Sequence, residues 1–110
     1  MEMDIEELKR KMQLNFLVKN QSVHTDISAA AAMGDIKLAH RLAHSLKGNA
    51  GMIGKMELKN AAAEVEVLLR DGTAAVWESK MHNLKNQLMP VLEELKSMFD
   101  ADNEKPGAEK

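Results

Sequence analysis

Apolar residues recur every three or four positions along most of this chain, which is the spacing that places them on one face of an α-helix. The spacing of Ile5, Leu8 and Met12 predicts a first short helix. The same pattern continues over about residues 13–33 and predicts a second, longer helix that ends at Gly34.

Glycines divide the rest of the chain into three further helical segments. The pattern predicts helices over about residues 36–53, 56–70 and 73–99. Gly54 and Gly72 end the first two of these segments, as glycine commonly does after a helix. Thr73 is expected to cap the last helix, and Pro90 is expected to bend it because proline lacks a backbone N–H.

Five helical segments with short connections, four of them long, predict an all-α fold. We expect an antiparallel up-and-down four-helix bundle with a short additional N-terminal helix. Residues 1–100 are expected to form this single domain. Residues 101–110 are mostly polar and are expected to be a disordered tail.

Composition narrows the class of protein. The 110 residues include no cysteine, which excludes a disulfide scaffold and cysteine-based zinc or redox chemistry. The net charge of −2 argues against general affinity for nucleic acid. No apolar run is long enough to cross a membrane, and the acidic start of the chain does not resemble an export signal. We therefore expect a cytoplasmic protein with no contact to a membrane.

One face of the helix expected over residues 36–53 combines a histidine with basic residues and glycines. At about 100° per residue, the residues within about 60° of His44 are Lys37, His40, Arg41, Lys47, Gly48 and Gly51. A polar helix face is most often passive surface. However, Gly48 and Gly51 each cost about 1 kcal/mol relative to alanine inside a helix. Since core packing gives no reason for them, these glycines indicate that another protein approaches the imidazole of His44.

The charges beside His44 suit an anion. Arg41 and Lys47 lie about one helical turn before and after it, where their cationic groups are placed to neutralise a negative group held on the imidazole. A phosphoryl group fits this description.

The run from His44 to Gly54, HSLKGNAGMIG, resembles the signature of the histidine-containing phosphotransfer (HPt) domain family. That signature is His-x-Leu-Lys-Gly followed by small residues and a further glycine, and the resemblance extends over about residues 16–95. It implies that His44 accepts phosphate, that Lys47 lies near it and that Gly48 leaves space for the partner.

Glu66 stands where the family often has a glutamine, twenty-two residues after the phosphoacceptor histidine. In the family this side chain bonds the imidazole nitrogen that is not phosphorylated, and the phosphotransfer domains of chemotaxis kinases can have glutamate there. A carboxylate that accepts from Nδ1–H would fix the tautomer and raise the basicity of Nε2. Without the resemblance, Glu66 is more simply explained as an exposed glutamate between two buried neighbours, Val65 and Val67.

The resemblance implies a phosphocarrier in a two-component phosphorelay, and the chain has no Gly-rich nucleotide-binding motif of its own. His44 would accept a phosphoryl group from the aspartyl phosphate of a response-regulator receiver domain and pass it to another receiver, with a sensor or hybrid histidine kinase as a further partner. Mg²⁺ would be held by the receiver, so we expect no cofactor in this chain, and we expect a monomer. The partner-docking residues are expected to be Arg41, His40, Gly48, Gly51 and Met52.

Three alternatives remain open from the sequence. The first is that the chain is the phosphoacceptor domain of a chemotaxis-type histidine kinase, for which glutamate at position 66 is mild support. A bundle that binds its partners without being phosphorylated is a second alternative. A metal site is a third, because His40 and His44 have the i, i+4 spacing of paired histidine ligands. The neighbouring cationic side chains and the lack of a third ligand on that face argue against the metal.

Overall fold

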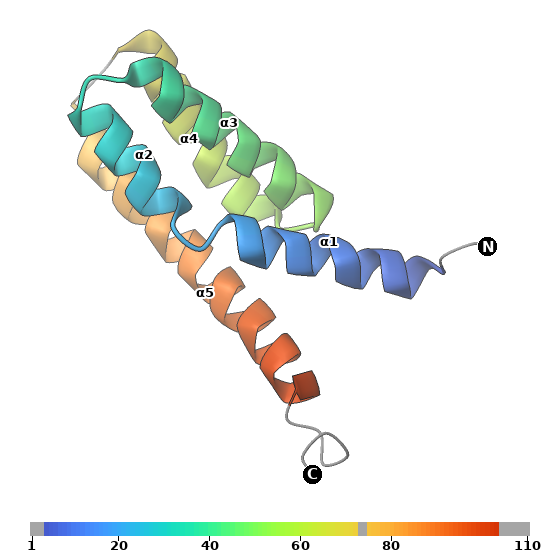
Figure 1. Cartoon of the computed structure of the whole chain (residues 1–110). Helices are drawn as coiled ribbons and strands as arrows, with labels where there is room; N and C mark the ends of the chain where they lie inside the picture. The colour runs from blue at the N-terminus through green and yellow to red at the C-terminus, as the bar shows by residue number, and fades with distance from the viewer. Residues whose placement is uncertain (1–3, 73–74, 104–110) are drawn as a thin grey trace.

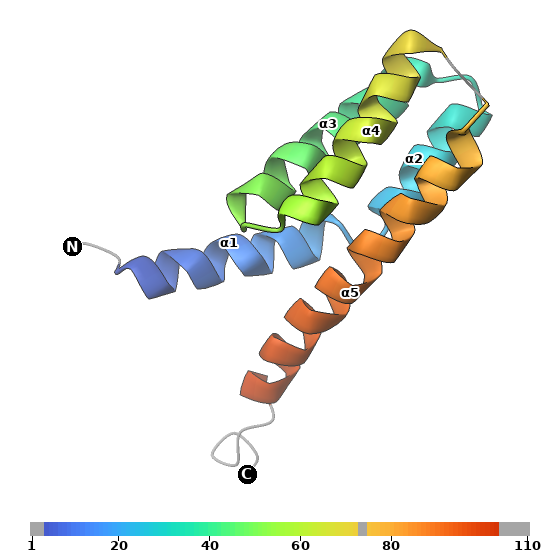
Figure 2. The ribbon, with the colours of Figure 1, turned by 180° about the vertical axis from the view of Figure 1, so that it is seen from behind.

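The computed structural model describes residues 4–72 and 75–103, in which every regular element is an α-helix. The helices are α1 (Ile5–Lys19), α2 (Val23–Ala32), α3 (Ile36–Met52), α4 (Met56–Asp71) and α5 (Trp77–Asn103). Helices α2 to α5 run alternately up and down as a four-helix bundle (Figure 1). Helix α1 runs across the end of the bundle where α3 turns into α4, and the last part of α5 extends past it (Figure 2). The predicted all-α fold class is confirmed.

The break between the first two helices lies at residues 20–22, so the boundary expected near residue 13 was wrong. A contact between residues close in the sequence fixes the start of α1. Asp4 caps the helix by accepting a hydrogen bond from the backbone N–H of Glu7 at 2.8 Å. Its end depends on Asn20, which is buried and whose side-chain amide donates to the carbonyl of Phe16 at 3.0 Å. Asparagine competes in this way with helical hydrogen bonding. The apolar spacing runs through both helices and therefore does not mark the break.

Two glycine turns fix where α3 begins and ends. Gly34 and Gly54 have φ angles of 83° and 77°, in the left-handed region that suits glycine. After Gly34 the carboxylate of Asp35 accepts from the backbone N–H of Leu38 at 3.2 Å and caps α3. After Gly54 the backbone N–H of Lys55 donates to the carbonyl of Ala50 at 2.9 Å and closes the turn into α4. These contacts set the register of α3 and α4 in the bundle.

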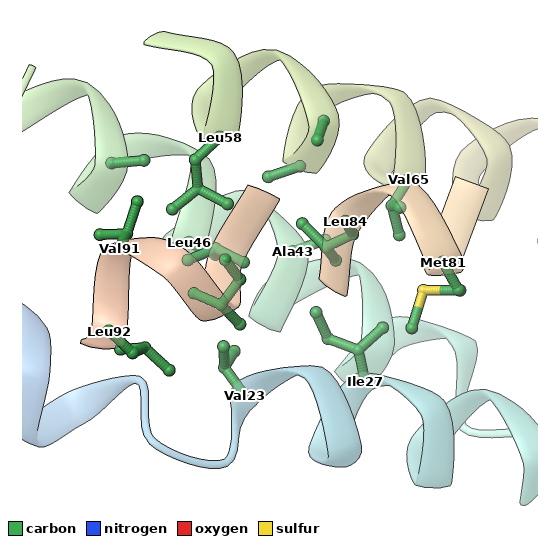
Figure 3. Packing of buried hydrophobic residues seen from close by; sticks show 14 of the residues in the cluster. Val23, Ile27, Ala43, Leu46, Leu58, Val65, Met81, Leu84, Val91 and Leu92 are labelled. Atoms are coloured by element: carbon green, nitrogen blue, oxygen red, sulfur yellow. The ribbon is translucent and has the colours of Figure 1, made fainter. Parts of the chain in front are cut away.

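The core is a single cluster of hydrophobic side chains from all five helices, part of which is drawn in Figure 3. Its largest fully buried members are Ile27, Leu46, Leu58, Val65, Leu84, Leu88 and Leu95. Half of the buried residues of α3 and α4 are alanines: Ala39, Ala43, Ala50, Ala61 and Ala62. Because alanine occupies little volume, these two helices pack closely, and side chains at the edges of their interface can meet.

The last helix begins and ends about four residues further along the chain than the sequence indicates, at Trp77–Asn103 in place of residues 73–99. Helix α5 continues through Pro90 and ends at Asn103, so the first three residues of the expected tail are helical. The remainder of that tail and the proposed cap Thr73 lie outside the described residues. None of the helices in the described ranges combines the length and hydrophobicity that a membrane span requires.

Candidate functional site

The site consists of one buried carboxylate in contact with three basic side chains. Glu66 on α4 is only 8% exposed. Its Oε2 lies 2.7 Å from Nδ1 of His44 and 3.5 Å from Nε2 of His40, and its Oε1 lies 2.8 Å from Nζ of Lys47. All three basic side chains come from successive turns of α3. The close packing of α3 on α4 therefore assembles the site.

The contacts of Glu66 define its charge and the tautomer of His44. Burial alone raises the pKa of Glu66, but the hydrogen bonds and positive charges of Lys47 and His44 outweigh this effect, and the pKa lies below its ordinary value of 4.5. The carboxylate is therefore ionised at neutral pH and can only accept hydrogen bonds. It follows that Nδ1 of His44 carries the proton in the bond to Glu66, and that Nε2 of the neutral ring keeps its lone pair.

The imidazole of His44 is accessible although its Nδ1 is held by a buried group. The side chain is 63% exposed. One turn further along α3, a Cβ added at Gly48 would meet nothing within 4 Å, so no described part of the chain covers this position. Arg41, one turn before, is exposed. A protein surface can therefore approach the ring of His44 from this side.

Glu66 is not the exposed glutamate that the simpler explanation of the sequence requires. It is buried, and its neighbour Val67 is the exposed one, at 41%. The expectation that Val65 and Val67 are both buried holds only for Val65. The ion pair with Lys47 and the hydrogen bond from His44 make the burial of the Glu66 carboxylate possible.

Two of the expected docking residues lie in surroundings that the helical periodicity does not indicate. A Cβ at Gly51 would lie 3.3 Å from Cδ of Lys59, so packing inside the molecule does give a reason for this glycine, contrary to expectation. Met52 is 63% exposed but lies beside α1, where it lines a shallow groove with Met12 and Phe16. Lys59 itself carries no sequence signal that connects it with the site.

His40 contacts the carboxylate of Glu66 and is also partly exposed to solvent. Its side chain is 36% exposed, and its ring stacks on that of His44 with centroids 6.4 Å apart and planes within 9°. Although Glu66 joins the two histidines, no group of three or more potential ligands in the described residues has an arrangement suited to a metal ion. The ammonium group of Lys47 on the same carboxylate also disfavours a cation there.

Comparison with known proteins identifies the family of the chain. The model of the Hpt domain family matches residues 3–101, which is most of the chain. Neither a search of curated proteins nor a search of solved structures finds a significant match. The match to the family model shows that the chain belongs to the Hpt domain family. Hpt domains are phosphocarrier modules that take part in histidine phosphotransfer in phosphorelay signalling, where they interact with receiver domains and histidine kinases.

Proposed function

We propose that His44 is the phosphoacceptor, and that it takes a phosphoryl group from the aspartyl phosphate of one receiver domain and passes it to another. In the first step Nε2 of His44 attacks phosphorus, the N–P bond forms, and the bond between phosphorus and the aspartate oxygen breaks. The aspartate leaves as a carboxylate, and the proton on Nδ1 stays in place. The observation that carries this proposal is the 2.7 Å bond from Nδ1 to Glu66, which leaves Nε2 as the free nucleophile.

Glu66 supports the attack electrostatically. As Nε2 donates its lone pair, positive charge develops on the imidazole, and the carboxylate at Nδ1 stabilises that charge. Because Glu66 is buried and held by its contacts, little reorganisation is needed when the reaction occurs. Glu66 is thus a positioning and activating residue for His44.

Lys47 has a different role from the one that its spacing indicates. Its Nζ lies 2.8 Å from Oε1 of Glu66, on the carboxylate oxygen that does not bind His44. We infer that Lys47 mainly orients the carboxylate, and that Arg41, which lies exposed on the same helix, supplies positive charge toward the incoming phosphoryl group. Lys47 remains close enough to His44 to add to the same field.

The docking surface is proposed to surround His44 on α3 and to include Arg41, His40, Gly48, Gly51 and Met52. The receiver contributes the acidic pocket and its Mg²⁺, so this chain contributes only the histidine and its supporting groups. Ile5 and Leu8 on α1, which are 78% and 49% exposed, offer further apolar area to a partner. The chain is proposed to act as a monomer in the cytoplasm.

The second candidate is the phosphoacceptor domain of a chemotaxis-type histidine kinase. The same His44 would then receive phosphate from ATP bound to a separate kinase domain. The carboxylate at position 66, where the family often has glutamine, favours this candidate. The two candidates share the site and differ only in the donor.

Phosphorylation with defined donors tests the proposal. The protein is incubated with a phosphorylated receiver and Mg²⁺, beside His44→Gln and a matched His82→Gln variant that alters an exposed histidine on α5. We expect a gain of one phosphoryl group, labile in acid and transferable to a second receiver, in the wild type and in His82→Gln but not in His44→Gln. A kinase domain with ATP in place of the receiver distinguishes the second candidate. If receivers, kinase domains and a small phosphoramidate donor all leave His44 unmodified, the phosphocarrier proposal is wrong and a scaffold role explains the surface better.

A further inference from the structure

A second histidine shares the carboxylate oxygen on which the phosphoacceptor depends. Oε2 of Glu66 lies 2.7 Å from Nδ1 of His44 and 3.5 Å from Nε2 of His40. The two rings are nearly parallel, at 9°, with centroids 6.4 Å apart. The carboxylate that holds Nδ1 of His44 therefore also lies within ion-pair distance of a second imidazole.

The other groups around His40 leave Glu66 as its main counter-charge. On α4 the contact is with Glu66, and on α2 the titratable groups bond elsewhere: His24 to the carbonyl of Met81 at 2.9 Å and Asp26 to Ser22 at 3.0 Å. Helix α1 meets α3 near its other end, around Met52. The remaining charged or titratable groups on the His40 side of α3 are Lys37, Arg41, His44 and Lys47. Within the part of the chain that the structure describes, no other acidic group forms an ion pair with His40.

We propose that His40 is a positioning residue that competes with His44 for Glu66 and so limits the protonation of the phosphoacceptor. A carboxylate at Nδ1 activates the neutral imidazole, but it also stabilises the imidazolium, in which Nε2 is protonated and cannot attack phosphorus. His40 offsets this second effect. When His40 holds a proton, it pairs with Oε2, places a like charge beside His44 and leaves the lone pair on Nε2 of His44. This proposal rests on the proposed function only because that function uses the lone pair of Nε2 to attack phosphorus.

The distance between the rings sets the size of the effect. Two unit charges 6.4 Å apart disfavour each other by a factor of about three at the dielectric constant of water. The protonations of His40 and His44 are thus coupled, and each titration curve spreads over a wider pH range than that of a single site.

Histidine titration followed by NMR on the intact chain tests the coupling without any phosphotransfer. Imidazole ¹⁵N signals of the wild type are compared with those of His40→Gln, His40→Lys and the control His82→Gln. In His40→Gln we expect a single-site curve for His44 with its midpoint higher by up to about 0.5 pH unit, the threefold factor above. His40→Lys, which fixes a positive charge at this position, should move the midpoint below that of His40→Gln. A shift smaller than about 0.1 pH unit in both variants, with their helical content and melting temperature retained, would overturn the proposal.

Rate measurements test the functional consequence separately. With a small phosphoramidate donor, the rate of phosphate acceptance is measured for each protein at pH 6 and at pH 8. The ratio of the pH 6 rate to the pH 8 rate should be about two- to threefold lower in His40→Gln than in the wild type, and it should be higher in His40→Lys than in His40→Gln. A structural role alone would lower both rates by the same factor, and that result would contradict the proposal. If the NMR shifts occur but the wild type accepts no phosphate, the coupling stands and the proposed function fails.

Discussion

Replacing Gly48 with alanine should stabilise the fold and weaken transfer from the partner. Gly48 lies inside α3, and a Cβ added there meets nothing within 4 Å. The substitution therefore causes no clash in the free protein. It should recover the helix propensity that glycine lacks, about 0.8–1.0 kcal/mol. For a domain of this size, that gain corresponds to a rise in melting temperature of about 4 °C.

The same methyl group stands one turn from His44, where we expect the partner to approach. Filling a tightly packed interface with one extra methyl costs about 1–3 kcal/mol, so transfer from a phosphorylated receiver should slow by about 5- to 150-fold. A small phosphoramidate donor needs no protein surface, so its reaction with His44 should be unchanged. The assays are urea or thermal unfolding for stability, and phosphohistidine formed per second with each donor.

Gly51→Ala is the matched control for this prediction. There the new Cβ lies 3.3 Å from Cδ of Lys59, a flexible side chain that must shift by a few tenths of an ångström. Its gain in stability should be smaller than that of Gly48→Ala. If Gly48→Ala lowers the stability, or slows the two donors equally, the reasoning about an open position reserved for the partner is refuted.

Three further predictions concern the site and the core. Because the pKa of Glu66 is lowered in the folded state from 4.5, its stabilisation is complete above about pH 4.5 and is lost as the pH falls through the lower folded value. The free energy of unfolding, measured in urea from pH 6 to pH 3, should therefore fall more in the wild type than in Glu66→Gln, and equal slopes would contradict this reasoning. Lys47→Met removes the ammonium group that pairs with Oε1 of Glu66, and it should lower the free energy of unfolding in urea at pH 7 by about 1–2 kcal/mol. Lys47→Arg should restore most of this loss. If Lys47→Met causes no loss, the ion pair does not stabilise the fold. Leu46→Ala, at a fully buried position, should cost about 2–5 kcal/mol in the same assay while the folded fraction still accepts phosphate on His44; a smaller loss would indicate that the core closes around the cavity.

The sequence alone determines most of the helical architecture, because the signals are local. Apolar spacing, the cap at Asp4 and the glycines at positions 34, 54 and 72 each act within a few residues of the chain, and they place the limits of α3 and α4 to within about one residue. The run that begins at His44 is local in the same sense, so its resemblance to the Hpt domain family is visible without a structure. The end of α1 is one exception, because it depends on the burial and hydrogen bonding of Asn20. The limits of α5, which is Trp77–Asn103 in place of the expected residues 73–99, are another.

The geometry of the site is decided only by the tertiary structure. Helical periodicity gives the direction of each side chain around the helix axis. It does not give the height, which is the position along that axis at which a residue of a neighbouring helix packs. That height determines that Glu66 is buried, that it bonds Nδ1 of His44, and that Lys47 points to its other oxygen. It also brings Lys59 over Gly51 and His40 to the shared carboxylate. These contacts join α3 to α4, and the small buried alanines let the two helices approach closely enough to make them.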